Sequence, residues 1–105
     1  MQFTSFLENG KLTVALTGEI DHHCAKNYIH AILGKIEAYT PEVCILDFSE
    51  VSFIDSSGIA VVINALRAMG QYGGTLYLSG MKDQPMRVFR ASGIDKLVKI
   101  LEVVS

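Results

Sequence analysis

The segment Phe53-Ile54-Asp55-Ser56-Ser57-Gly58-Ile59 joins a predicted strand to a predicted apolar helix. Aspartate and serine are preferred residues at the position that caps the start of a helix. That start leaves four backbone N–H groups without intrahelical partners and carries partial positive charge, so it can bind a capping side chain or a phosphate. We expect one of Ser56 and Ser57 to cap the helix, with Asp55 competing for the role. The other serine is then available for a function.

Three strands are predicted before this segment. The turn Asn9-Gly10 is typical of a two-residue hairpin and predicts an antiparallel pair of strands over residues 3–8 and 11–17. Pro41 interrupts the chain, and residues 43–48 then form a nearly continuous apolar run. Such a run is typical of a strand that is covered on both faces or central in its sheet.

Two helices flank the third strand. Asp21 is the predicted N-cap of the first, whose apolar residues recur every three or four positions: Ala25, Tyr28, Ile29, Ile32, Leu33 and Ile36. The second helix is predicted from about residue 57 to residue 70, with one apolar stripe formed by Ile59, Val62, Ile63, Leu66 and Met69. Its other positions are also unusually apolar, namely Ala60, Val61, Ala65 and Ala68. We therefore expect part of this apolar surface to lie outside the core.

The rest of the chain continues the alternation of strands and helices. Gly73-Gly74 leads into a strand at residues 75–79, and a short last strand is predicted within residues 97–103. Between them lies a third helix with Asp83 as candidate cap, Pro85 in its first turn and Gly93 as its stop. The order predicts an α/β fold in which a β-hairpin is followed by β-α units. Right-handed crossovers give a mixed, mostly parallel sheet with the helices packed on one face.

Composition limits the class of protein. With 105 residues, 50% of them hydrophobic, the chain is predicted to form one domain spanning residues 1–105. The net charge of -2 and the scattered charges argue against a nucleic-acid partner. Its apolar runs are shorter than the roughly 20 residues of a spanning helix, and no signal peptide is evident, so we expect a soluble cytoplasmic protein with no membrane partner. Cys24 and Cys44 are interpreted as small apolar residues without a disulfide.

Three segments follow the predicted ends of parallel strands. They are residues 19–23, residues 53–57 and residues 80–83. The carboxyl ends of parallel strands share one edge of a sheet, and ligands usually bind there. We therefore expect any functional site to be built from these three loops.

These loops are poorly suited to catalysis or metal binding. A serine nucleophile would need His22 or His23 as base and Asp21 or Asp47 to orient that base. The chain lacks a Gly-x-Ser-x-Gly elbow, and a domain of this size leaves little volume for a substrate cleft. Consecutive helical residues point about 100° apart, so the run from His22 to Cys24 is a poor metal site. We predict no enzyme activity, no metal and no cofactor.

Four motifs together resemble a known family. The segments Gly18-Glu19-Ile20-Asp21-His22-His23-Cys24-Ala25 and Phe53-Ile54-Asp55-Ser56-Ser57-Gly58-Ile59 are similar to the two signature segments of the anti-sigma factor antagonists, the bacterial STAS domains. Gly73-Gly74-Thr75-Leu76 and Val88-Phe89-Arg90-Ala91-Ser92-Gly93-Ile94 stand where that family has the entry to its last strand and its third helix. The resemblance extends over nearly the whole chain.

The resemblance implies a phosphorylation switch at Ser56. In the family the first serine of this motif is phosphorylated by a partner that is both anti-sigma factor and serine kinase, of the GHKL type. The unphosphorylated form binds that partner and releases a sequestered regulator, and a PP2C-type serine phosphatase restores binding. The output implied for this chain is a sigma factor or another regulator, such as one controlling biofilm formation or stress.

The resemblance also implies roles for the neighbours of Ser56. Asp21 matches the acidic residue beside the phosphorylation loop, and the partner-binding surface would include Asp55, Ser57, Gly58 and Ile59. Cys24 departs from the small hydroxyl residue that the family often has there, which affects only a local cap. Two alternatives remain: a STAS adaptor or small-ligand-sensing module without phosphorylation, and a small hydrolase.

Overall fold

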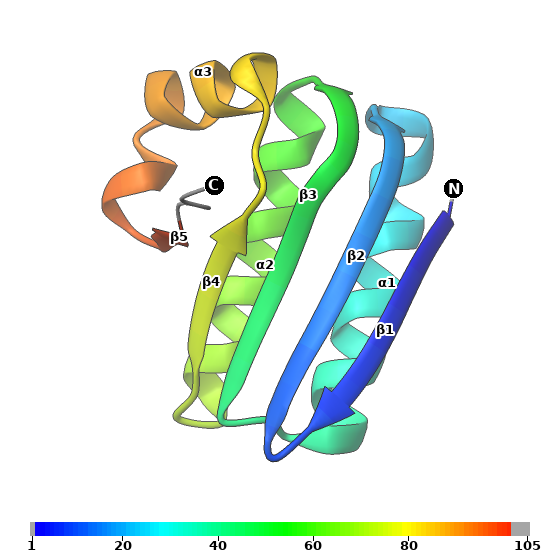
Figure 1. Cartoon of the computed structure of the whole chain (residues 1–105), viewed down its shortest axis with the longest axis vertical. Helices are drawn as coiled ribbons and strands as arrows, with labels where there is room; N and C mark the ends of the chain where they lie inside the picture. The colour runs from blue at the N-terminus through cyan, green and yellow to red at the C-terminus, as the bar shows by residue number, and fades with distance from the viewer. Residues whose placement is uncertain (1, 102–105) are drawn as a thin grey trace.

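A computed structural model gives the fold of this chain and describes residues 2–101. Figure 1 shows a mixed sheet of five strands in the order β1-β2-β3-β4-β5, with α1 and α2 on one of its faces. Strand β1 is antiparallel to β2, and all the other neighbouring pairs are parallel. The elements are β1 (Gln2–Glu8), β2 (Lys11–Ile20), α1 (His22–Tyr39), β3 (Val43–Ile54), α2 (Ser56–Gln71), β4 (Thr75–Ser79), α3 (Asp83–Ser92), the 3₁₀ helix η1 (Ile94–Lys96) and β5 (Lys99–Leu101). The predicted α/β fold class is confirmed.

The hairpin at the start of the chain forms as predicted. Asn9 and Gly10 have φ angles of 52° and 78°, which is the type I′ turn that matches the twist of the flanking strands. Glu8 pairs with Lys11 directly beside the turn. Strand β1 therefore forms one edge of the sheet.

Strands β2 and β3 extend beyond their predicted ends, to Ile20 and Ile54. Between the pairs Ala15–Asp47 and Thr17–Glu50, β3 advances three residues while β2 advances two, and a second shift follows between Gly18 and Glu19. Each extra residue in β3 is a bulge, which breaks the alternation of buried and exposed side chains. The sequence prediction ended the strand at residue 48 because polar residues follow this position.

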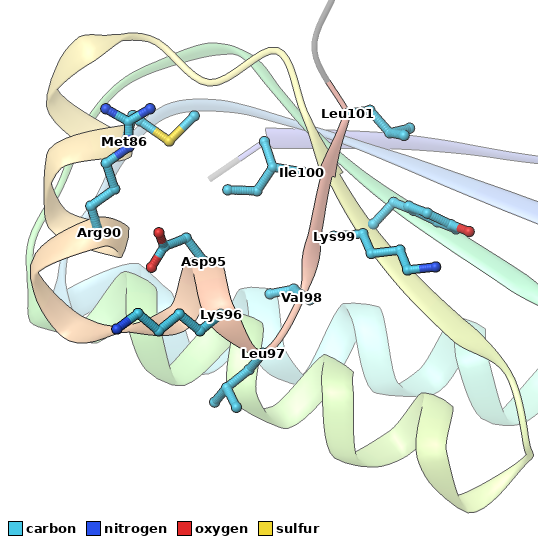
Figure 2. A pocket seen from close by; sticks show the side chains of 10 residues that line it. Met86, Arg90, Asp95, Lys96, Leu97, Val98, Lys99, Ile100 and Leu101 are labelled. Carbon is cyan, nitrogen blue, oxygen red and sulfur yellow. The ribbon is translucent and has the colours of Figure 1, made fainter.

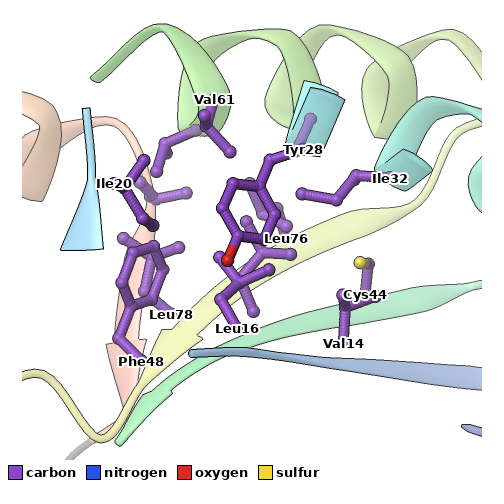
Figure 3. Packing of buried hydrophobic residues seen from close by; sticks show 14 of the residues in the cluster. Val14, Leu16, Ile20, Tyr28, Ile32, Cys44, Phe48, Val61, Leu76 and Leu78 are labelled. Carbon is purple, nitrogen blue, oxygen red and sulfur yellow. The ribbon is translucent and has the colours of Figure 1, made fainter. Parts of the chain in front are cut away.

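The core lies between the sheet and the two long helices (Figure 3). Figure 3 shows Leu16 and Leu76 of the sheet near Tyr28 of α1, and all three residues belong to the buried core cluster. Strand β3 is central in the sheet, and its alternating burial shows that only one of its two faces is fully covered. Residues 43–48 were predicted to form a strand that is either covered on both faces or central in its sheet, and the central position is observed.

Part of the apolar surface of α2 lies outside the core, as predicted. Val62 and Met69 are buried, but Ile59, Ile63 and Leu66 are only half-buried at the margin of the core. The remaining buried residues of α2 are Gly58, Val61, Ala65 and Ala68. Small residues on this face let α2 approach its neighbours closely, and the larger side chains of Ile59, Ile63 and Leu66 lie at its flank.

Helix α3 and the last strand differ from the prediction in their details. Asp83 is not the cap but the first helical residue; Lys82 holds the N-cap position and makes no side-chain capping bond. Gly93 ends the helix in a left-handed conformation (φ 83°), as predicted. Phe89 packs edge-on against Phe48, with ring centroids 5.6 Å apart, and so fixes α3 to the core. Within the predicted range 97–103, only Lys99–Leu101 forms a strand; residues 102 and 103 lie outside the described residues.

Candidate functional site

The loops after β2, β3 and β4 meet at one edge of the sheet, which we call the carboxyl-end rim (residues 19–23, 53–57 and 80–84). Figure 1 shows this rim at the top of the molecule. The backbone N–H of Asp55 donates to the carbonyl of Ile20 over 3.1 Å and so joins the first two loops. The prediction that these loops come together is confirmed.

Gln84 joins the third loop to the second. Its side-chain Oε1 accepts a hydrogen bond from the N–H of Ile54, and its Nε2 donates to the carbonyl of the same residue, each over 2.9 Å. Strand β4 pairs with β3 only as far as Asp47, so the Gln84 amide takes the place of a neighbouring strand at the end of β3. Sequence reasoning missed Gln84, because nothing local in the sequence indicates a contact that only the packing of α3 creates.

The cap of α2 is Asp55. Its backbone is extended (φ -103°, ψ -168°), and its Oδ1 accepts a hydrogen bond of 2.7 Å from the N–H of Ser57. The expectation that a serine caps this helix was therefore wrong, because the carboxylate of Asp55 stands one residue earlier, where the cap geometry is met. Ser56 and Ser57 are the first two residues of the helix.

Ser56 is exposed, whereas Ser57 and Ile59 are half-buried. Among residues 2–101, no hydrogen bond of the Ser56 hydroxyl is found. Gly58 is buried, and a Cβ added to it would lie 2.9 Å from the Cβ of Ile54. A glycine here therefore allows the first turn of α2 to rest on the end of β3 with Ser56 facing outward.

Asp21 caps α1 in the same rim. Its Oδ1 accepts hydrogen bonds from the N–H groups of His23 (2.9 Å) and Cys24 (3.3 Å), which confirms the predicted cap. Desolvation acts to raise the pKa of Asp21, but the backbone N–H groups of His23 and Cys24 outweigh it and lower that pKa below its ordinary value of 3.8. The Cys24 thiol donates to the carbonyl of Glu19 over 3.3 Å, so this residue makes the local contact that a hydroxyl would make.

The lowered pKa of Asp21 predicts a pH dependence of stability that Asp21→Asn should remove. Asparagine caps helices about as well as aspartate but carries no charge. Because the pKa is lower in the folded state, the carboxylate contributes stability above about pH 4, and this contribution is lost as the pH falls through the folded-state pKa. The wild-type protein should therefore unfold at a higher temperature than Asp21→Asn at pH 7. The two unfolding temperatures should converge as the pH falls to about 2. A difference that stays constant with pH would contradict the prediction.

The arrangement of a catalytic triad is not found at the rim. The Asp21 carboxylate is engaged by backbone N–H groups, and Oδ1 of Asp47 accepts from the N–H of Ser49 over 2.9 Å. The rings of His22 and His23 instead lie against each other, with centroids 4.0 Å apart. Among residues 2–101, no hydrogen bond from an imidazole to either carboxylate is found. Within the described part of the chain, no three His, Cys, Asp or Glu side chains gather as metal ligands.

A hollow of about 720 Å³ lies outside the rim, between α3, η1 and β5. Figure 2 shows the side chains of Met86, Asp95 and Ile100 around it. Asp95 Oδ1 is buried and has no hydrogen-bond partner among residues 2–101. No residue from the loops after β2 and β3 lines this hollow, so it is separate from the site around Ser56.

No helix within residues 2–101 is long and apolar enough to cross a membrane.

Comparisons with known proteins agree on one family. The family model described as "STAS domain" matches residues 7–105. An anti-sigma-B factor antagonist of Listeria monocytogenes is 30% identical over 95 residues, which cover 88% of this chain and 80% of that protein.

Solved structures show the same fold. The anti-sigma factor antagonist from Mycobacterium paratuberculosis superposes with a TM-score of 0.83 at 24% identity, over 94% of this chain and 83% of the other. The Bacillus cell fate determinant SpoIIAA in its phosphorylated form superposes with a TM-score of 0.76 at 24% identity, over 99% and 93% of the two chains.

Proposed function

The chain belongs to the STAS domain family, as an anti-sigma factor antagonist, and we propose that it is a partner-switching regulator controlled by phosphorylation of Ser56. In its unphosphorylated form it binds an anti-sigma factor that is also a serine kinase of the GHKL type. Phosphorylation abolishes that binding, and a PP2C-type phosphatase restores it. The protein acts by binding in the cytoplasm and catalyses no reaction itself.

The observation that supports this proposal most directly is the exposed hydroxyl of Ser56. Asp55 caps α2, so phosphorylation of Ser56 removes no helix cap. Because Ser56 is the first helical residue and is exposed, a kinase can reach it without unfolding the domain. One solved structure of the same fold is a SpoIIAA in its phosphorylated form.

Charge explains how one phosphate switches binding. A phosphoserine adds roughly -1.5 to -2 charges beside Asp55, in a rim that also holds Asp21. The positive end of α2 offsets part of the repulsion within the domain. A bound partner that presents no matching arginine receives no such offset, because the dianion must be desolvated at the interface. The same phosphate is therefore tolerated by the fold and disruptive to the complex.

The partner-binding surface of this proposal starts at Ser57, Gly58 and Ile59 and continues along α2. Ile59, Ile63 and Leu66 leave part of their apolar surface uncovered on this helix. Apolar surface beside an exposed polar site is typical of protein interaction surfaces. In this proposal, the apolar residues of α2 that the core leaves uncovered contact the partner. Asp21 helps to orient the loop toward the kinase.

Mass spectrometry of the protein isolated from its native host tests the proposal. We expect a phosphate on Ser56 in peptide spectra, and an intact mass that falls by one phosphate after phosphatase treatment. Ser56 unmodified under all growth conditions tested would contradict the switch and favour the adaptor or ligand-sensing alternative. A phosphate on Ser57 instead would keep the switch but contradict the assignment of the acceptor.

A further inference from the structure

Strand β1 is an edge strand that nothing in the described fold covers. It runs for seven residues, pairs only with β2, and keeps a regular register from end to end. Natural proteins usually protect such an edge with lysine, proline, a bulge or a very short strand. Strand β1 contains no lysine or proline and no bulge, whereas the opposite edge, β5, has only three residues. The β1 edge is therefore open to pairing with another strand.

The turn between β1 and β2 determines which backbone groups face outward. In a two-residue hairpin the residues flanking the turn form a hydrogen-bonded pair, here Glu8 and Lys11. Alternate residues of β1, Thr4 and Phe6, therefore also bond to β2. The N–H and C=O groups of the three residues between these positions point away from the sheet: Phe3, Ser5 and Leu7.

These same residues project their side chains toward the helix-covered face, because they lie opposite Leu16, Val14 and Leu12 of β2. Leu7 is 44% exposed, and Phe3 is only half-buried at the margin of the core. The free edge thus combines unpaired backbone groups with apolar side chains that are incompletely covered.

We propose that β1 pairs antiparallel with β1 of a second copy of this chain, with Ser5 opposite Ser5. This is the register that pairs all seven residues, and it opposes outward-facing residues with outward-facing ones, so that each such pair exchanges two hydrogen bonds. Phe3 of each copy then lies opposite Leu7 of the other, and the two incompletely covered side chains cover each other. The Glu8 residues of the two copies lie at opposite ends of the paired strands, so their carboxylates do not meet. The edge is therefore complementary to itself in hydrogen bonding and in apolar contact.

This pairing leaves the carboxyl-end rims accessible. A two-fold axis through Ser5 reverses the strand direction, so the two rims lie at opposite ends of the joined sheet, and both Ser56 hydroxyls stay exposed. A contact of one short strand per copy is smaller than the roughly 800 Å² per partner of a standard stable interface. The dimer is therefore weak and forms as the protein concentration rises.

Sedimentation equilibrium tests the dimer with a matched pair of variants. Between about 10 µM and about 1 mM, the wild-type protein should change from monomer toward dimer, with a dissociation constant in that range. Leu7→Lys places a charge against Phe3 of the second copy and should raise this constant at least about tenfold. Leu97→Lys makes the same change at a residue that is 65% exposed and distant from β1 in sequence, and should leave the constant unchanged. A protein that stays monomeric to about 1 mM, or a dimer that both variants affect equally, would overturn the proposal.

Amide hydrogen exchange identifies the interface directly. The N–H groups of Phe3, Ser5 and Leu7 should exchange fast in dilute protein and more slowly at high concentration, whereas those of Thr4 and Phe6 should be protected at both. Ser5→Pro removes an outward N–H and should abolish the concentration dependence while the hairpin still forms. If this variant does not fold, Leu7→Lys replaces it in the exchange experiment. Concentration-dependent protection elsewhere, with none at these three residues, would show a different interface and contradict β1 pairing.

Discussion

Replacing Ser56 with aspartate is expected to weaken binding to the anti-sigma factor kinase at least about tenfold, whereas Ser56→Ala should bind like the unphosphorylated wild-type protein. No hydrogen bond of the Ser56 hydroxyl is found within residues 2–101, so its removal costs the fold little. A carboxylate at the same place adds negative charge beside Asp55 and must be desolvated in the complex. About 1.4 kcal/mol of such a penalty already gives a tenfold change in affinity.

Titration calorimetry with the anti-sigma factor kinase of the native host, in the absence of ATP, measures this effect. Gln71→Glu is the control, because it adds the same charge at the opposite, exposed end of α2 and should leave the affinity unchanged. Equal affinities of Ser56→Ala and Ser56→Asp would refute the switch. If Gln71→Glu lowered the affinity as much as Ser56→Asp, the net charge of the protein would determine binding, and not the position of the charge at residue 56.

Phe89→Ala is expected to lower the free energy of unfolding by about 3–5 kcal/mol. The Phe89 side chain is completely buried, and its ring packs edge-on against Phe48 of β3. Its truncation leaves a cavity between α3 and the sheet and removes an aromatic pair. Urea denaturation followed by circular dichroism measures the change. Leu97→Ala is the control, because Leu97 is 65% exposed and its truncation should change the stability little. A decrease in the free energy of unfolding below about 1 kcal/mol for Phe89→Ala would contradict the assigned packing.

Local patterns were sufficient to predict most of the fold. The Asn9-Gly10 turn has the conformation that its residue types favour, and Gly93 ends α3 in the left-handed region. Strand β4 has its predicted bounds. These elements depend on signals within a few residues, so the sequence alone identifies them. The placement of three loops at one rim was also predictable, because it follows from the order of strands and helices.

Other features depend on contacts that are distant in sequence. The bulges of β3 arise from its pairing with β2, so the period of two that predicts strands could not follow β3 to Ile54. The buried face of α2 includes Gly58, whose close approach to Ile54 hydrophobicity alone does not reveal. Asp55, Ser56 and Ser57 all suit a helix cap, and only the backbone geometry distinguishes Asp55 from the serines.

The paired hydrogen bonds between Gln84 and Ile54 have a consequence for local unfolding. Ile54 immediately precedes the cap of α2, and beyond the end of β4 its backbone depends on a side chain from α3. Fraying of the first turn of α3 therefore leaves both backbone groups of Ile54 without a protein partner, and detachment of Ile54 leaves the Gln84 amide unpaired in the same way. The segment that presents Ser56 and the start of α3 should thus open and close as one cooperative unit. In the proposed switch, a kinase that displaces one of these segments therefore displaces both.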